Sequence, residues 1–111
     1  MNPIIAWLRR LWDQHGPARR LIEVDSDVLP NPLPIRNLVL LRDDGDDLSV
    51  GMRCPCGCGA TIELMVIPEA KPQWSFSTDA QGRPTLHPSV WRNTGCRSHF
   101  WVRTGRIHWC E

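Results

Sequence analysis

Apolar residues alternate with other residues from position 48 onward, which predicts two strands joined by a tight turn. The alternating apolar positions are Leu48, Val50, Met52, Ile62, Leu64 and Val66. Because successive side chains of a strand point to opposite faces, these residues predict a hairpin with one buried face. A three-residue tip at positions 55–57 places Cys54 opposite Cys58, and Met52 opposite Ala60. We expect every cross-strand pair on the buried face to be apolar.

A second hairpin is predicted near the end of the sequence, with Thr104 and Gly105 as its turn. The register pairs Phe100 with Trp109, Val102 with Ile107, Trp101 with His108, and His99 with Cys110. The first two pairs share one face of the hairpin, and the last two share the other. This register brings the Cα atoms of His99 and Cys110 to within about 4.5–5.5 Å of each other.

Shorter elements are predicted between and before the two hairpins. The apolar run at 38–41 predicts a buried strand, and the aspartate-rich segment 43–47 predicts an exposed turn. That segment lacks the wider ligand spacing and the distal glutamate of a calcium loop. Residues 74–77 predict another short strand. Residues 83–89 predict a loop or an edge strand, because proline is confined to strand edges.

The first part of the sequence predicts an amphipathic helix over residues 3–15. Its apolar side chains fall within an arc of about 160°; they are Ile4, Ile5, Trp7, Leu8, Leu11 and Trp12. Asn2 is a suitable N-cap, and Gly16 followed by Pro17 ends the helix. We expect the apolar face to dock on the protein's own core or on a second copy. A partner protein or a membrane surface is the alternative.

The composition supports one small, mainly β domain. The chain has 111 residues, a formal net charge of +1 and 41% hydrophobic residues, which suffices for a single small core. Ten prolines and eight glycines argue against a mostly helical protein. No apolar run approaches the roughly 18 residues of a membrane-spanning helix.

The first residues also bear on the state of the thiols. Arg9 and Arg10 follow a very short apolar stretch, which is the reverse of the order in a secretion signal. We therefore expect a cytoplasmic protein. In that compartment thiols stay reduced, and clustered cysteines bind metal more often than they form disulfides.

Three thiols within five residues, Cys54, Cys56 and Cys58, predict half of a metal site. About 40 residues later, Cys96 and His99 provide a second short-range pair. Two such sets separated by a long segment are typical of a tetrahedral structural site for Zn²⁺, which would clamp the two hairpins together.

Six side chains compete for the four positions around the ion: Cys54, Cys56, Cys58, Cys96, His99 and Cys110. Cys96 and His99 are the first choice because their spacing matches half of a zinc knuckle, and Cys56 and Cys58 follow. Cys54 competes closely with them, and Cys110 stays a candidate because the predicted register brings it beside His99.

Other chemistries fit the cysteines less well. An iron–sulfur centre of the Rieske type lacks its second Cys-x-His pair, and a redox site lacks a Cys-x-x-Cys motif. A catalytic zinc site is disfavoured because cysteine-rich coordination lowers Lewis acidity and no His-Glu-x-x-His spacing occurs. Purely structural buried cysteines are the remaining alternative. We assign no catalytic residue from the sequence, and we expect no active-site role for His15, His87 or His108.

These predictions combine into one architecture. Three prolines in residues 30–34 form a stiff connector. We therefore divide the chain into residues 1–34, with the helix and the connector, and residues 35–111, a zinc-binding β domain. The expected domain is a small antiparallel β fold of zinc-ribbon-like hairpins clamped by the metal.

The stretch from about residue 48 to 110 resembles a family of small uncharacterised bacterial and phage proteins. The resemblance rests on four segments: CPCGCG at 54–59, PTLHPS at 84–89, GCRSHFW at 95–101 and IHWC at 107–110. It implies a zinc-binding role for the cysteines and His99. It also implies a setting beside genes for bacterial ubiquitin-like conjugation proteins.

Three functions follow as hypotheses. The first is an adaptor that binds a protein partner, in a ubiquitin-like conjugation pathway, through the helix or through Trp91 or Trp101. The second is nucleic-acid binding, since residues 83–111 contain five arginines against only Glu111, interleaved with aromatic residues. The third is a thiol-dependent transfer enzyme that uses a cysteine outside the metal site.

Overall fold

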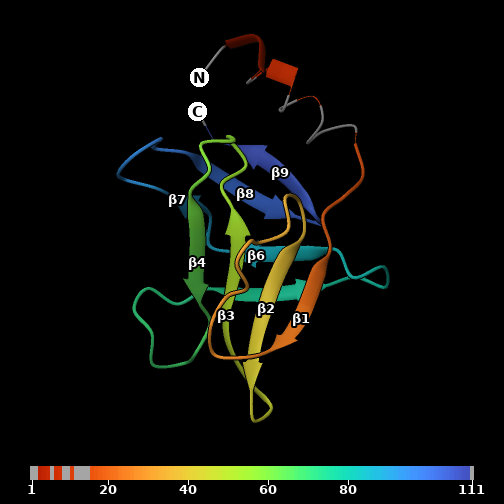
Figure 1. Ribbon diagram of the computed structural model, residues 1–111, viewed down its shortest axis with the longest axis vertical. Coiled ribbons are helices and arrows are strands. Elements are labelled where there is room, and N and C mark those ends of the chain that lie inside the picture. Colours follow the sequence, from red (N-terminus) through yellow and green to blue (C-terminus); the bar gives the residue numbers. More distant parts are fainter. Residues whose placement is uncertain (1–2, 6, 9–10, 12–15, 111) are drawn as a thin grey trace.

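The structure, a computed structural model, describes residues 3–5, 7–8, 11 and 16–110 (Figure 1). This part of the chain contains nine strands: β1 (Leu21–Asp25), β2 (Leu38–Asp43), β3 (Asp46–Arg53), β4 (Thr61–Met65), β5 (Ser75–Thr78), β6 (Pro84–His87), β7 (Val90–Trp91), β8 (His99–Arg103) and β9 (Arg106–Trp109). They form sheets in the orders β1-β2-β3-β4, β5-β6 and β7-β8-β9. The mainly β fold that we predicted is confirmed.

The four-stranded sheet is built around β2, whose first four residues are all buried. Leu38 and Leu40 face the main core, whereas Val39 and Leu41 pack with Leu33 in a smaller cluster on the other face. A strand covered on both faces needs a continuous apolar run, which explains the pattern at 38–41. The predicted strand is confirmed here. The turn predicted over 43–47 is narrower than expected: it consists of Asp44 and Gly45, since Asp43 ends β2 and Asp46 begins β3.

The β3–β4 hairpin has a different register from the one that we predicted. Met52 pairs with Ile62 rather than with Ala60, and the Cys54 amide donates to the Ala60 carbonyl at 2.9 Å. We call residues 54–60 the β3–β4 tip. Five residues lie between its closing pair, Cys54 and Ala60, and two of them, Gly57 and Gly59, have positive φ angles of 87° and 85° that widen the turn. Because the slip is two residues, five of the six predicted side chains stay buried in the main core, but Cys58 does not lie opposite Cys54. Our prediction for Leu48 was wrong: this side chain packs with the smaller cluster on the other face, next to the bulge in the β2–β3 register.

The β7-β8-β9 sheet confirms the register predicted for the second hairpin. Observed pairs are Phe100 with Trp109, Trp101 with His108, and Val102 with Ile107. The register continues one step further, since the Cys110 amide donates to the His99 carbonyl at 2.9 Å. Thr104 and Gly105 form the turn with positive φ angles of 51° and 74°, as a two-residue hairpin connection requires. The two-residue strand β7 was absent from our prediction.

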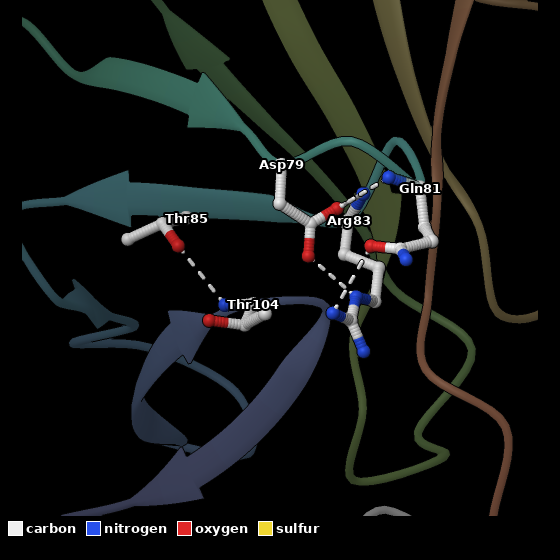
Figure 2. A network of polar contacts seen from close by, with 5 residues as sticks. All are labelled: Asp79, Gln81, Arg83, Thr85 and Thr104. Atoms are coloured by element: carbon white, nitrogen blue, oxygen red, sulfur yellow. Dashed lines mark hydrogen bonds and ion pairs between the residues drawn. The ribbon is translucent and has the colours of Figure 1, made fainter.

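The β5–β6 hairpin is the third unit of the fold. Our predicted strand at 74–77 lies one residue early, and the segment 83–89 contains the strand β6. Figure 2 shows the polar network at its turn: the Asp79 carboxylate accepts from the backbone amides of Gln81 and Arg83 at 3.0 and 2.9 Å. The Thr104 amide donates to the Thr85 hydroxyl at 2.9 Å, which joins β6 to the β8–β9 turn.

The three sheets share one apolar core. Figure 1 shows β5 and β6 crossing behind the four-stranded sheet, with β7, β8 and β9 beyond the end of β3 and β4. Leu38, Leu86 and Phe100, one from each sheet, are fully buried in the same cluster. The sheets are too small to be stable separately, so this shared core holds them together.

The segment 1–34 contributes more to the sheet than we expected. Its strand β1 pairs in parallel with β2, with Leu21 opposite Leu38, and this strand was missed from the sequence.

The described residues of the predicted helix are helical, and four of them are exposed at 45–67%: Ile4, Ile5, Trp7 and Leu8. This exposure differs from the docking that we expected. Asn2, Trp12 and His15 lie outside the described residues, and no helix of the described part is long and apolar enough to span a membrane.

Gly105 provides a test of how the sheets are joined. Its amide donates to the Pro84 carbonyl and its carbonyl accepts from the Arg19 amide, both at 2.7 Å. A Cβ at this position would collide with the Arg19 carbonyl oxygen. We expect Gly105→Ala to lower the free energy of unfolding by about 2–4 kcal/mol, from backbone strain plus displaced packing. Urea denaturation measures this change.

The matched control is Gly45→Ala, because Gly45 also has a positive φ but nothing lies within 4 Å of an added Cβ. Gly45→Ala should lower the free energy of unfolding only by the conformational strain, about 1–2 kcal/mol. Equal losses in the two variants would contradict the close approach of Gly105 to Arg19.

Asp79 makes stability depend on pH. Hydrogen bonds from the Arg83 amide, followed by contacts with the Arg83 side chain and the Gln81 amide, lower the pKa of the Asp79 carboxyl below its ordinary 3.8. A lowered folded-state pKa contributes stability above the unfolded-state value, and this contribution is lost as the pH falls through the folded-state pKa. We expect Asp79→Asn to be less stable than the parent at neutral pH, with the difference closing below pH 3.8. A difference in urea midpoint that stays constant over this range would contradict the assignment.

Candidate functional site

Four cysteines from two segments converge on one point. The β3–β4 tip supplies Cys54, Cys56 and Cys58, and the segment 92–98 between β7 and β8 supplies Cys96. The four Sγ atoms all lie within 4.8 Å of one another. Cys54 is at the centre, with its sulfur 3.3 Å from that of Cys56 and 3.5 Å from that of Cys96. All four are free thiols, and we call them the cysteine cluster.

The geometry of the cluster fits a tetrahedral metal ion. Zn²⁺ binds thiolate sulfur at about 2.3 Å, which places the four sulfurs of a tetrahedral site about 3.8 Å apart. The two shortest separations given above, 3.3 and 3.5 Å, lie close to this value, and all the others are within 4.8 Å. Four soft sulfur donors also match a structural site, since four protein ligands leave no position for water or substrate.

The thiols differ in how readily they ionise. Burial raises the pKa of Cys54, and it raises that of Cys56 to about 12 despite hydrogen bonds that lower it. Burial also raises the pKa of Cys96, but hydrogen bonds from the side chain and backbone of Ser98 outweigh it, and the net value is about 6. A pKa of about 6 gives the Cys96 thiol strong thiolate character at neutral pH.

Two side chains of the segment 92–98 surround the cluster. The Ser98 hydroxyl, on a residue that is only 7% exposed, lies 3.1 Å from the Cys96 sulfur and 3.5 Å from the Cys54 sulfur. The Arg92 guanidinium donates from Nη1 to the sulfurs of Cys96 at 3.1 Å and Cys58 at 3.5 Å. Hydroxyl and guanidinium donors favour the thiolate form that a metal ion requires.

The remaining two candidate ligands lie outside this cluster. His99, a first choice from the sequence, directs Nε2 toward the Ser89 hydroxyl instead. Cys110 is half-buried and lies beside His99 in the strand register, as predicted, without joining the four sulfurs. Of the six predicted donors, the structure therefore brings together four.

Ser89 and His99 form a second site that the sequence analysis missed. The Ser89 Oγ lies 3.0 Å from the His99 Nε2, and both residues are half-buried. A serine hydroxyl within hydrogen-bond reach of an imidazole is the basic arrangement of a serine nucleophile and its general base. Ser89 belongs to the segment PTLHPS and His99 to the segment GCRSHFW, but from the sequence we interpreted His99 only as a metal ligand.

Strand pairing brings these two residues together. Ser89 lies between β6 and β7, and His99 is the first residue of β8. β7 pairs with β8 through buried Val90 opposite Phe100 and through Trp91 opposite His99. The Trp91 ring stacks on the His99 ring, with centroids 5.0 Å apart and planes at 15°. Within the described part of the chain, His99 forms no ion pair with a carboxylate, so this stacking is the contact that orients the imidazole.

The arginines of the C-terminal segment have partners within the protein. Arg83 pairs with Asp79, Arg103 lies 4.8 Å from the centroid of the Trp101 ring, and Arg106 donates to the Gly16 carbonyl at 2.8 Å. With Arg92 engaged by the cluster, four of the five arginines that suggested nucleic-acid binding have internal roles. Nucleic-acid binding stays a prediction without a structural feature in its favour.

Comparison with known proteins places this architecture in a family. A family model described as "Bacterial ubiquitination-like system serine protease (BubE)" matches residues 25–110. This range contains β2 to β9, the cysteine cluster and the Ser89–His99 pair. No curated protein and no solved structure matches the chain. The association with ubiquitin-like systems expected from the sequence is confirmed: the chain belongs to the family of bacterial ubiquitination-like system serine proteases (BubE).

Proposed function

We propose that this protein is a serine peptidase of a bacterial ubiquitination-like system, with Ser89 as nucleophile and His99 as general base. The 3.0 Å contact between Ser89 Oγ and His99 Nε2 carries the proposal. The family description supplies the reaction class independently of that contact. The system named in that description indicates that the substrate is a ubiquitin-like protein or one of its conjugates.

The reaction follows from the two side chains. Neutral His99 accepts the Ser89 proton at Nε2 while Oγ attacks the substrate carbonyl carbon, and a tetrahedral intermediate forms. The resulting imidazolium donates its proton to the leaving group, which departs and leaves an acyl group on Ser89. His99 then takes a proton from water, the hydroxide attacks the acyl carbonyl, and Ser89 is released with its proton restored.

The cysteine cluster serves a structural purpose in this proposal. Cys54, Cys56, Cys58 and Cys96 would hold one Zn²⁺, which bonds the β3–β4 tip to the segment 92–98. This is the clamp between hairpins that the sequence predicted, with a different ligand set. The free Cys110 is the one cysteine left for the transfer chemistry that we also considered.

The adaptor hypothesis requires an exposed binding surface near Ser89 and His99 but no catalytic pair. Trp91 is 69% exposed beside Ser89, and an exposed tryptophan suits the contact with a protein partner. An adaptor would need the exposed tryptophan, but it would not need the hydrogen bond between the Ser89 hydroxyl and the His99 imidazole. Removing that hydroxyl therefore distinguishes the two functions.

Ser89→Ala should abolish hydrolysis while leaving the fold intact. Loss of a serine nucleophile lowers kcat by at least about 1,000-fold. The assay is cleavage of a fusion between the system's ubiquitin-like protein and a reporter domain. A fluorophosphonate should also label the parent at Ser89. Ser75→Ala, on the exposed face of β5, is the matched control and should cleave at the parental rate.

Unchanged cleavage by Ser89→Ala, or a parent protein that neither cleaves the fusion nor reacts with the fluorophosphonate, would contradict the peptidase proposal. Retained binding of the ubiquitin-like protein by an inactive parent would favour the adaptor.

Metal analysis tests the ligand set. We expect native mass spectrometry to find one Zn²⁺ per chain in the parent, and each of Cys54→Ser, Cys56→Ser, Cys58→Ser and Cys96→Ser to lose it or bind it far more weakly. Cys110→Ser and His99→Gln should keep the full metal content because those residues lie outside the cluster. Metal loss in Cys110→Ser or His99→Gln, with retention in a cluster variant, would disprove this ligand set.

A further inference from the structure

Arg92 is the charged side chain, among the described residues, that donates to both segments of the cysteine cluster; the Ser98 hydroxyl also contacts both. Arg92 follows β7 directly, and its Nη1 reaches the sulfur of Cys96 in its own segment and that of Cys58 on the β3–β4 tip. Its amide donates to the Ser98 carbonyl at 2.8 Å, which closes the base of the segment 92–98. Arg92 therefore holds this segment through both its backbone and its side chain.

The Arg92 guanidinium lies next to Gly95 of the same segment. Gly95 has a positive φ of 65°, and a Cβ added there would lie 3.5 Å from Arg92 Nη2. Arg92 is half-buried, whereas Cys58 and Cys96, whose sulfurs accept from it, are exposed residues. Within the described residues, Arg92 is the cationic side chain that donates to the cluster.

The charge of the loaded cluster explains why an arginine is useful at this position. Four thiolates around a divalent cation carry a net charge of about −2, and half-buried negative charge is costly without compensation. One guanidinium offsets half of this charge and can donate to two sulfurs at once. Both contacts come from the one nitrogen Nη1. Lysine offers the same charge on a compact, more strongly hydrated ammonium group, so it should replace these contacts only in part.

The adjacent residue connects this arrangement to the Ser89–His99 pair. Trp91 stacks on the imidazole of His99, and Arg92 follows it in the chain. The segment held by Arg92 begins three residues after Ser89 and ends immediately before His99. A shift of Arg92 would therefore move the residue that orients the general base.

We propose that Arg92 is a positioning residue that retains the metal ion in the cysteine cluster and couples the cluster to the Ser89–His99 pair. This inference rests on the metal site and the peptidase pair proposed above. Arg92 acts on the cluster through hydrogen bonds to Cys58 and Cys96, and on His99 through Trp91. In the described part of the chain, its hydrogen bonds go to the cluster sulfurs and to the Ser98 carbonyl rather than to Ser89 or His99.

The test compares Arg92→Gln with Arg97→Gln, because Arg97 is an exposed arginine of the same segment. The first measurement is the rate of Zn²⁺ transfer from the full-length protein to a colorimetric chelator. We expect Arg92→Gln to bind one Zn²⁺ and release it about 10- to 100-fold faster than the parent, the range found for residues that support metal ligands. Arg97→Gln should release it at the parental rate. Arg92→Lys should fall between the parent and Arg92→Gln.

The second measurement is the rate of fluorophosphonate labelling at Ser89 in the zinc-loaded proteins. We expect labelling of Arg92→Gln to be at least about tenfold slower than that of the parent, with Arg97→Gln unchanged. Parental rates of both metal release and labelling in Arg92→Gln would overturn the inference while leaving the proposed function intact. Faster metal release with parental labelling would overturn the coupling to the catalytic pair.

Failure of the proposed function gives different results. A parent protein that contains no metal would overturn both the metal site and the role of Arg92. A parent that binds Zn²⁺ but is not labelled would remove the peptidase proposal and with it the coupling, while the metal-release comparison would still decide whether Arg92 retains the ion.

Discussion

The close approach of four sulfur atoms holds the two segments of the site against each other. Cys54 and Cys96 are 42 positions apart in the sequence, yet their sulfurs lie 3.5 Å apart. The tip that carries Cys54 connects β3 and β4, and the segment that carries Cys96 connects β7 and β8 of a different sheet. Apolar packing holds these sheets together, and contacts of sulfur, hydroxyl and guanidinium groups join the tip to the segment 92–98. A metal ion bound there would replace weak thiol contacts with coordinate bonds.

The position of the Ser89–His99 pair follows from the same constraint. The two residues flank the stretch from Val90 to Ser98, which leaves the sheet after β7 and returns to it at β8. Buried Val90 and Phe100 fix its two ends, while the cysteine cluster fixes its middle. A catalytic pair needs its hydroxyl and imidazole held to within a fraction of an ångström. In so small a protein, with few residues to support a site, we propose that the cluster provides this rigidity.

Local chemistry decided which parts could be predicted from the sequence. The β8–β9 register was predicted correctly because Thr104 and Gly105 allow only a two-residue turn. The β3–β4 register was wrong by two residues because Gly57 and Gly59 permit a wider tip than three residues. Strand β1 was missed because its parallel pairing with β2 leaves no local signal. The cysteine cluster was recognisable from spacing, whereas the Ser89–His99 contact depends on β7, a strand too short to produce a pattern.

We propose that the cysteine cluster maintains the geometry of the Ser89–His99 pair. The rate of fluorophosphonate labelling at Ser89, measured as a function of metal content, tests this dependence. Stepwise removal of Zn²⁺ by a chelator should slow labelling in proportion to the metal removed, and adding Zn²⁺ back should restore it. Near-ultraviolet circular dichroism of buried Phe100 and half-buried Trp109, whose rings are in contact, monitors the core during the titration. Labelling that continues at full rate in the metal-free protein would contradict the account.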